Sequence, residues 1–215
     1  MTGFPIDRQP RRRPLRLAAA ALAALTLTGC APLLLGGAVV GGAVLVTDRR
    51  TSGSQVDDQM IEIKSNGRMD EAFGDRARIS TTSYNRMALL TGEVADASDK
   101  TLAEQVVARV DNVQSVVNEL TIGPRNTFAE RTRDAFVTAK VKASLFDAKD
   151  LFANSIKVVT HRGTVYLMGR LTEREATRAS EVARGVSGVT KVVRVFEVVS
   201  ESELANTQRK SVARP

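Results

Sequence analysis

Two stretches of the chain, residues 79–92 and 156–169, are rich in β-branched, aromatic and aliphatic residues and have a two-residue polar turn at the centre. The turns are Asn85-Arg86 and Arg162-Gly163. Short β-rich runs joined by two residues are typical of a β-hairpin. We therefore expect one hairpin in each half of the chain.

An amphipathic helix is expected before each hairpin. Helical periodicity predicts these helices over residues 57–68 and 132–146. In the second helix the apolar positions form one stripe, made of Val137, Val141, Leu145 and Ala148.

Each hairpin is followed by a helix and a closing strand. The first of these helices starts at Asp96 or Ser98, and the second starts at Thr172, which begins a Thr-x-x-Glu capping-box pattern. The closing strands are predicted at residues 113–122 and 189–199. The order αββαβ therefore occurs twice, and Ile79 and Ile156, like Gly92 and Gly169, stand 77 residues apart.

The repeat predicts an α+β protein of two tandem modules, residues 55–123 and 124–200. A strand–helix–strand crossover that follows an antiparallel hairpin gives a mixed sheet. Each αββαβ module should therefore be a three-stranded mixed sheet with two helices on one face. The pair Gly123-Pro124 marks the boundary between the modules.

The N-terminus has the pattern of a bacterial lipoprotein signal peptide, residues 1–29. Arginines precede the apolar residues 17–27, which lead into Leu27-Thr28-Gly29-Cys30. We expect Cys30 to carry a diacylglycerol and an N-acyl chain, because several acyl chains anchor a protein stably. The alternative is a plain signal anchor with a buried cysteine. Ala31, where an aspartate would favour inner-membrane retention, predicts a lipid anchor in the outer membrane, facing the periplasm.

The segments outside the modules are predicted to lack a fixed fold. Residues 30–54 are interpreted as the acylated cysteine and a flexible linker near the membrane, with residues 48–55 polar. Residues 33–46 are apolar but too short and too rich in glycine to span a bilayer, and a short inserted helix is the alternative. The tail, residues 201–215, is expected to be disordered.

The composition argues against an enzyme. The 215 residues contain one Cys and one His, so neither a Cys–His pair nor a multi-His metal site can form once Cys30 is acylated. His161, which ends a strand, is expected at the surface. We expect no catalytic residue, no metal, no small-molecule substrate and no cofactor besides the acyl chains on Cys30.

Several phrases resemble the BON domain. They are the hairpin that closes in Leu167-Met168-Gly169, the segment Thr172-Glu173-Arg174-Glu175-Ala176, and Gly185-Val186-Ser187-Gly188-Val189-x-x-Val192. Two such domains behind a lipobox resemble the DolP (YraP) group of outer-membrane lipoproteins. The resemblance implies a non-enzymatic protein that binds anionic phospholipid through its second BON domain and preserves outer-membrane integrity, often at the division site. The first copy lacks the signature glycine at Val110-Asp111-Asn112-Val113.

The net charge of the two modules supports a phospholipid partner for the second. Residues 48–122 contain 9 Lys and Arg against 13 Asp and Glu, a net charge of −4. Residues 125–199 contain 14 against 8, a net charge of +6. An anionic bilayer therefore attracts the second module.

One face of the helix over residues 132–146 provides an apolar contact for such a bilayer. With Val137, Val141 and Leu145 toward the core, the helical repeat places the remaining apolar residues outward, between cations. The expected lipid-binding residues are Arg133, Phe136, Ala139, Lys140, Lys142, Ala143 and Phe146, with Leu151 and Phe152 in the following loop. In the resembled group a Trp often stands at the position of Phe136. The alternative is that Phe146 and Phe152 fold under and complete the core.

Two other functions compete with this interpretation. Gly185-Val186-Ser187-Gly188 satisfies the GxxG of KH domains, but that loop joins two helices, whereas here Gly188 leads into a strand. Export by the lipobox also separates the chain from nucleic acid, so no nucleic-acid partner is expected. The second alternative is a periplasmic scaffold for outer-membrane assembly proteins, with no direct lipid recognition.

Overall fold

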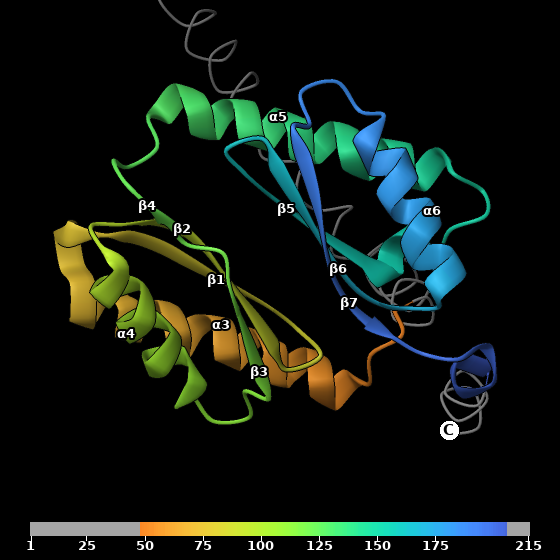
Figure 1. Cartoon of the computed structure of the whole chain (residues 1–215). Helices are drawn as coiled ribbons and strands as arrows, with labels where there is room; N and C mark the ends of the chain where they lie inside the picture. The colour runs from red at the N-terminus through yellow and green to blue at the C-terminus, as the bar shows by residue number, and fades with distance from the viewer. Residues whose placement is uncertain (1–47, 206–215) are drawn as a thin grey trace, which may run out of the picture. The chain divides into compact units, whose positions relative to one another are not determined.

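The computed structural model describes residues 48–205, which belong to one compact unit of the chain, Leu45–Pro215. The predicted signal peptide, Cys30 and the apolar segment 33–46 lie outside the described residues, as does 206–215. A pair of αββαβ modules follow one another over the described residues (Figure 1). The α+β class with tandem modules is confirmed.

The first module has a mixed sheet. Its elements are α3 (Ser52–Phe73), the 3-10 turn η1 (Gly74–Arg76), β1 (Arg78–Tyr84), β2 (Met87–Val94), α4 (Ala97–Ala108), β3 (Ser115–Asn118) and β4 (Thr121–Ile122). β1 pairs antiparallel with β2, while β3 and β4 both pair parallel with β2. The single closing strand predicted at 113–122 is therefore interrupted at Glu119-Leu120.

The second module repeats this arrangement. Its elements are α5 (Phe128–Asp147), the 3-10 turn η2 (Ala153–Ser155), β5 (Ile156–His161), β6 (Thr164–Leu171), α6 (Glu173–Arg184) and β7 (Lys191–Val198). β5 pairs antiparallel with β6, and β6 pairs parallel with β7 along its whole length. Both hairpins and both turns have the predicted positions.

A buried aspartate in the first helix of each module fixes the hairpin turn beneath it. The carboxylate of Asp58 accepts hydrogen bonds from the backbone N–H groups of Asn85 and Arg86, both at 2.7 Å. Asp134 accepts the corresponding bonds from the backbone of Arg162 and Gly163, at 2.8 and 2.9 Å. These turn residues have φ between 49° and 71°, so their amides would otherwise lack strand partners. The repeated aspartate thus sets the rotation of each helix over its sheet.

The repeated glycine of each hairpin is explained by a close backbone approach. A Cβ at Gly92 would lie 1.9 Å from the carbonyl oxygen of Arg78, and one at Gly169 would lie 2.7 Å from that of Ser155. Both distances are far below van der Waals contact. Only glycine lets the two strands of each hairpin meet there.

A third apolar cluster joins the two modules. Ala88 and Leu90 of β2 contribute to the core beneath α3 and α4, whereas Leu89, between them, contributes to this other cluster. Successive residues of a strand point to opposite faces, so the cluster lies on the sheet faces opposite the helices. Its buried members are Tyr84, Leu89, Tyr166, Met168 and Val195. The two sheets therefore pack against each other, between two outer helix layers (Figure 1).

Polar contacts surround this apolar contact. The phenol of Tyr84 donates to the carbonyl of Ser155 at 3.2 Å, and burial raises the pKa of Tyr84 to about 12. The ammonium of Lys157 pairs with the carboxylate of Glu62, at 2.5 Å. Arg162 pairs with Glu93, which is almost fully buried, at 3.1 Å. The two modules therefore share one continuous interior.

Both predicted borders of the folded region need correction. The first helix begins at Ser52 and not at Asp57, because Thr51 caps it by accepting a hydrogen bond from the backbone of Ser54 at 3.1 Å. Residues 52–54 are therefore helical and do not belong to a flexible linker. At the other end, residues 201–205 are helical and not disordered, because Leu204 is buried against the fold.

The shared interior predicts that the two modules unfold together. Replacing Leu89 with alanine should lower the free energy of unfolding by about 2–5 kcal/mol, since a cavity opens between the sheets. Urea titration followed by circular dichroism should show one cooperative transition, and hydrogen exchange should speed up in β6 as well as in β2. Leu102→Ala, at an exposed position of α4, is the control. Two separate transitions, with β6 unaffected, would contradict the shared interior.

Candidate functional site: the outer face of helix α5

The outer face of α5 carries a row of exposed phenylalanines. Phe128, Phe136 and Phe146 are 77%, 66% and 75% exposed, and Phe152, in the loop after the helix, is 53% exposed. Ala139 and Ala143 lie exposed between them. We call these six residues the phenylalanine strip. The helical rise places Phe128 and Phe146 roughly 27 Å apart.

The strip points outward because the opposite side of α5 is committed to the core. Val137, Val141 and Leu145 are buried against the second sheet. Asp134, on the same side, holds the hairpin turn as described above. Four constraints at helical spacing leave α5 no freedom to rotate, so its other apolar residues remain in solvent.

Cations lie along both edges of the strip. Arg133 and Lys140 are exposed on one edge and Lys142 on the other. The ammonium of Lys140 donates to the carbonyl of Ser187, at 2.6 Å, in the turn after α6. Lys140 therefore also ties α5 to that turn. Asp147, the last residue of α5, is an exposed acidic residue at the end of the strip.

The structure distinguishes among the residues that the sequence placed at this site. Phe136, Phe146 and Phe152 are all exposed, so the alternative in which Phe146 and Phe152 complete the core is wrong. Leu151 was expected in the exposed edge, but it is only 9% exposed and belongs to the core of the second module. Phe152, the next residue, is exposed and precedes the 3-10 turn η2.

Phe128 is a member of the strip that sequence reasoning missed. The helix was expected to start at Thr132, but α5 begins four residues earlier. The signal was present in the sequence: Thr127 and Glu130 form a capping box, in which the Thr127 side chain accepts from the backbone of Glu130 and the Glu130 carboxylate accepts from the backbone of Thr127. The Arg131 guanidinium lies 5.8 Å from the centre of the Phe128 ring.

Arg49 connects the end of the strip to the segment that enters the fold. Its guanidinium lies 5.2 Å from the centre of the Phe152 ring. It also makes two hydrogen bonds of 2.7 Å to the carboxylate of Glu175, and both side chains are almost fully buried. Burial alone would raise the pKa of Glu175, but the bonds from Arg49 and Thr172 outweigh it and lower the pKa to about 2.

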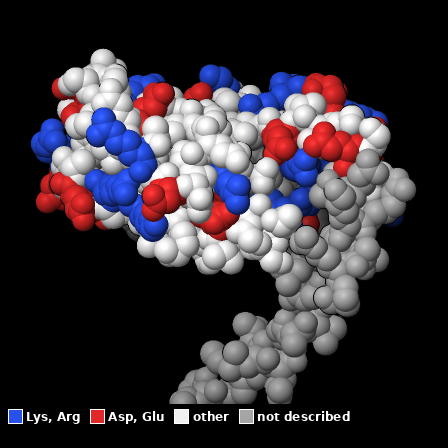
Figure 2. Space-filling model, turned by 90° about the horizontal axis from the view of Figure 1, so that it is seen from below, with Lys and Arg blue, Asp and Glu red and all other residues white. Residues whose placement is uncertain are grey.

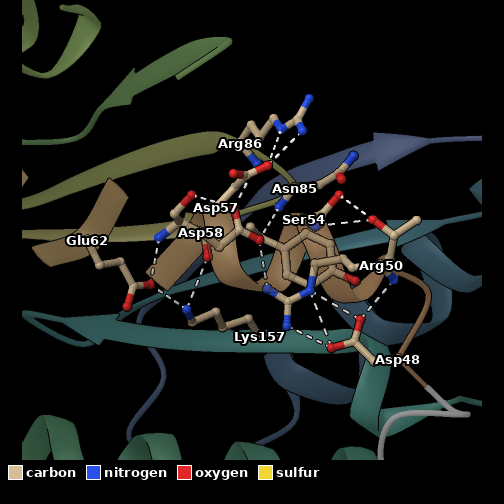
Figure 3. A network of polar contacts seen from close by, with 12 residues as sticks. Asp48, Arg50, Ser54, Asp57, Asp58, Glu62, Asn85, Arg86 and Lys157 are labelled. Carbon is tan, nitrogen blue, oxygen red and sulfur yellow. Dashed lines mark hydrogen bonds and ion pairs between the residues drawn. The ribbon is translucent and has the colours of Figure 1, made fainter. Parts of the chain in front are cut away.

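The next residue, Arg50, holds the first module. Figure 3 shows its guanidinium between Asp48 and Asp58. The bonds to these carboxylates are 2.7 and 2.8 Å long, and the guanidinium lies 4.4 Å from the centre of the Tyr84 ring. Lys157 of the second module reaches the same network (Figure 3). Residues 48–50, expected to lie in a flexible linker, are thus bound to both modules.

His161 is not a simple surface residue. Its Nε2 atom lies 3.1 Å from the carboxylate of Glu93, and its side chain is 14% exposed. The expected surface position is therefore wrong, because the first module covers this strand end. Within residues 48–205 no group of three or more His, Cys, Asp and Glu could hold a metal ion. No helix in this region of the chain is long and apolar enough to cross a membrane.

Two αββαβ modules joined through their sheets define a tandem two-domain protein, and each module matches the BON domain, over residues 57–124 and 133–200. The chain belongs to the BON-domain family.

Two curated relatives indicate which group of BON-domain proteins this chain resembles. Outer membrane lipoprotein DolP of Haemophilus influenzae is 35% identical over 177 residues, which cover 81% of this chain and 91% of that protein. The 21 kDa hemolysin of Actinobacillus pleuropneumoniae is 33% identical over 71% of this chain and 79% of its own. The chain is therefore a dual-BON protein of the DolP group, and this relationship supports an outer-membrane lipoprotein.

A solved structure of CdsD, a structural protein of the type III secretion system of Chlamydia trachomatis, aligns over 71% of this chain and 98% of its own. Its sequence identity is 14% and its TM-score is 0.29, a likeness too weak to support any conclusion.

The depressed pKa of Glu175 predicts a pH-dependent contribution to stability. The ordinary pKa of 4.5 in the unfolded chain exceeds the folded value of about 2. As the pH falls through this window, the unfolded state takes up a proton that the folded state does not, so stability decreases. The contribution present above pH 4.5 is about 3 kcal/mol and is lost toward pH 2.

The measurement is the free energy of unfolding of the natural chain and of Glu175→Gln between pH 7 and pH 2. The difference between the two should be largest near neutrality and shrink as the pH falls, since the variant lacks the titrating group. A difference that stays constant over this range would show that Glu175 has an ordinary pKa in the folded protein.

Proposed function

We propose that this protein is a non-enzymatic lipoprotein that binds anionic phospholipid at the periplasmic side of the outer membrane through α5 of its second BON domain. The observation that carries the proposal is the phenylalanine strip between cationic edges. Neither relative's name denotes an enzyme. By the resemblance to the DolP group, the bound protein helps to maintain outer-membrane integrity, including at the division site.

The strip and its edges contribute to binding in different ways. Full transfer of a phenylalanine side chain out of water contributes about 1.5–3 kcal/mol. Each Lys or Arg near an anionic bilayer adds about 1 kcal/mol, and salt screens this electrostatic contribution. Arginine and lysine stems reach upward to phosphates while the rings insert. Together they favour an anionic bilayer over a zwitterionic one.

The point where the chain enters the fold is also consistent with an orientation in which the outer face of α5 lies against the membrane. The Arg49 guanidinium lies 5.2 Å from the centre of the Phe152 ring, at one end of the strip. The 18 peptide units between Cys30 and Asp48 span at most roughly 65 Å when extended. Lipid chains on Cys30 and the rings of the strip can therefore enter the same bilayer.

A periplasmic scaffold is the second candidate function. The acidic first module, with its net charge of −4, is repelled by anionic lipid and needs another partner. In this alternative the module would contact outer-membrane assembly proteins, and lipid contact would be incidental.

Vesicle flotation with the unacylated chain, from residue 30 and carrying Cys30→Ser, distinguishes the two. Anionic vesicles should capture it and zwitterionic ones should not. Phe136→Ala or Phe128→Ala should weaken capture roughly tenfold, because about 1.5 kcal/mol of apolar transfer is lost. Lys142→Gln should weaken capture at low salt only.

Leu102→Ala, which removes an exposed apolar side chain from the first module, is the matched control and should leave capture unchanged. No capture by anionic vesicles, or capture that tolerates both phenylalanine substitutions, would leave only the scaffold function.

A further inference from the structure

The outer face of α3, in the first module, carries a second apolar row. Val56, Met60 and Ile63 are 60%, 45% and 63% exposed. Their outward direction follows from the buried positions Ile61 and Met69 on the other side of the helix. Figure 2 views the molecule from the side of α3 and α4, where charged atoms gather toward the ends and the middle is largely uncharged.

Two glycines extend this row to both sides. Gly53, Val56, Met60, Ile63 and Gly67 follow one another at intervals of three and four residues, which is the a/d spacing of a heptad seam. We call these five residues the α3 seam. Within the described residues, no other helix covers the α3 seam, and its apolar side chains are exposed.

No close packing contact within the described residues requires a glycine at either glycine position of the α3 seam. A Cβ at Gly67 would meet nothing within 4 Å, and one at Gly53 would meet only the Thr51 hydroxyl, at 3.9 Å. A glycine within a helix costs about 1 kcal/mol relative to alanine. Gly67 carries this cost in the interior of α3, whereas Gly53 is only the second residue of the helix. The cost at Gly67 is explained if another helix approaches there.

We propose that the α3 seam pairs with the same seam of a second copy of this chain, with the two helices antiparallel. In an antiparallel pair each a position meets a d position of the other helix. Val56 of one copy then fills the space above Gly67 of the other, and Met60 lies against Ile63. The two-fold axis repeats both contacts, so the surface is complementary to itself.

The residues that border the α3 seam fit this two-fold arrangement. On one border Asp57 and Lys64 of one copy come opposite Lys64 and Asp57 of the other, so unlike charges meet. On the other border Gln59 and Asn66 meet, and both are neutral. Within one copy Asp57 pairs with Arg86 at 2.6 Å, and the Asp57 side chain is 22% exposed. Lys64 pairs with Asp111 at 2.7 Å, and both of these side chains are well exposed. Such a surface ion pair contributes little and can exchange partners.

The small seam predicts a pair that forms at the membrane and not in dilute solution. Three exposed apolar side chains cover far less than the roughly 800 Å² per partner of a standard interface. Anchoring by acyl chains confines the copies to a surface, which raises their effective concentration without any new contact. The pairing depends on this anchor but not on lipid contact by α5.

Disulfide trapping in vesicles that carry the full acylated chain tests the pairing, because acylated Cys30 offers no competing thiol. Chains with Met60→Cys and chains with Ile63→Cys, mixed and oxidised, should give several-fold more covalent dimer than either chain alone. Leu102→Cys, exposed on α4, is the control and should give only background. A parallel pair would instead link Met60→Cys to itself, and that result, or background yield in every mixture, would overturn the proposal.

Gly67→Leu separates pairing from folding. Added to both cysteine chains, it should reduce trapping to the control level, because the leucine fills the space for Val56. It should not lower the thermal midpoint, since the position is open within the chain. Unchanged trapping would overturn the pairing. Phe136→Ala should leave trapping intact, so failure of lipid binding by α5 is detected separately, by flotation.

Discussion

The contact between the two sheets is the constraint on which the rest of the molecule depends. Each central strand, β2 and β6, is buried on both faces along nearly its whole length. One face is covered by the helices of its own module and the other by the sheet of the neighbouring module. A three-stranded sheet with two helices buries only one face by itself, so each module completes the other.

This contact also determines which surfaces are available for binding. With the sheets facing inward, the first helix of each module is on the outside, and the inner face of each sheet is no longer available to a large ligand. Met60 and Phe136 occupy equivalent positions in α3 and α5, and both are exposed. Duplication has thus placed two apolar helix faces on one body, and the difference in their surroundings favours different partners. Cations border the face on α5, whereas neutral and balanced residues border the face on α3.

The short segment at residues 48–50 connects the two modules through buried ion pairs. Arg49 neutralises the buried carboxylate of Glu175 in the second module, and Arg50 binds Asp58, the residue that fixes the first hairpin. Removing one partner from a buried ion pair leaves an uncompensated charge, which costs several kcal/mol. The point where the chain enters the fold is therefore fixed beside Phe152, and this fixes the direction from which a tether on Cys30 would arrive.

The sequence alone determined the local structure and the repeat. Hairpin turns, strand pairing and the buried stripe of α5 follow from residue periodicity and turn chemistry, which act over a few residues. It also predicted that Phe136 faces solvent, because the opposite side of one helix follows directly from the helical repeat. It placed Leu151 wrongly, since the direction of a loop residue depends on what closes the core beneath it.

Only the tertiary structure decided how the modules combine. A strand that is apolar on both faces does not reveal whether a helix, a membrane or another sheet covers its second face, and residues far apart in sequence, such as Leu89 and Met168, meet only after folding. Arg49 and His161 are buried against partners far away in the sequence, Glu175 and Glu93 respectively, so their burial was invisible in the sequence. Turns and helix faces depend on neighbouring residues and can be predicted from them, whereas burial against a distant surface is a property of the assembled fold.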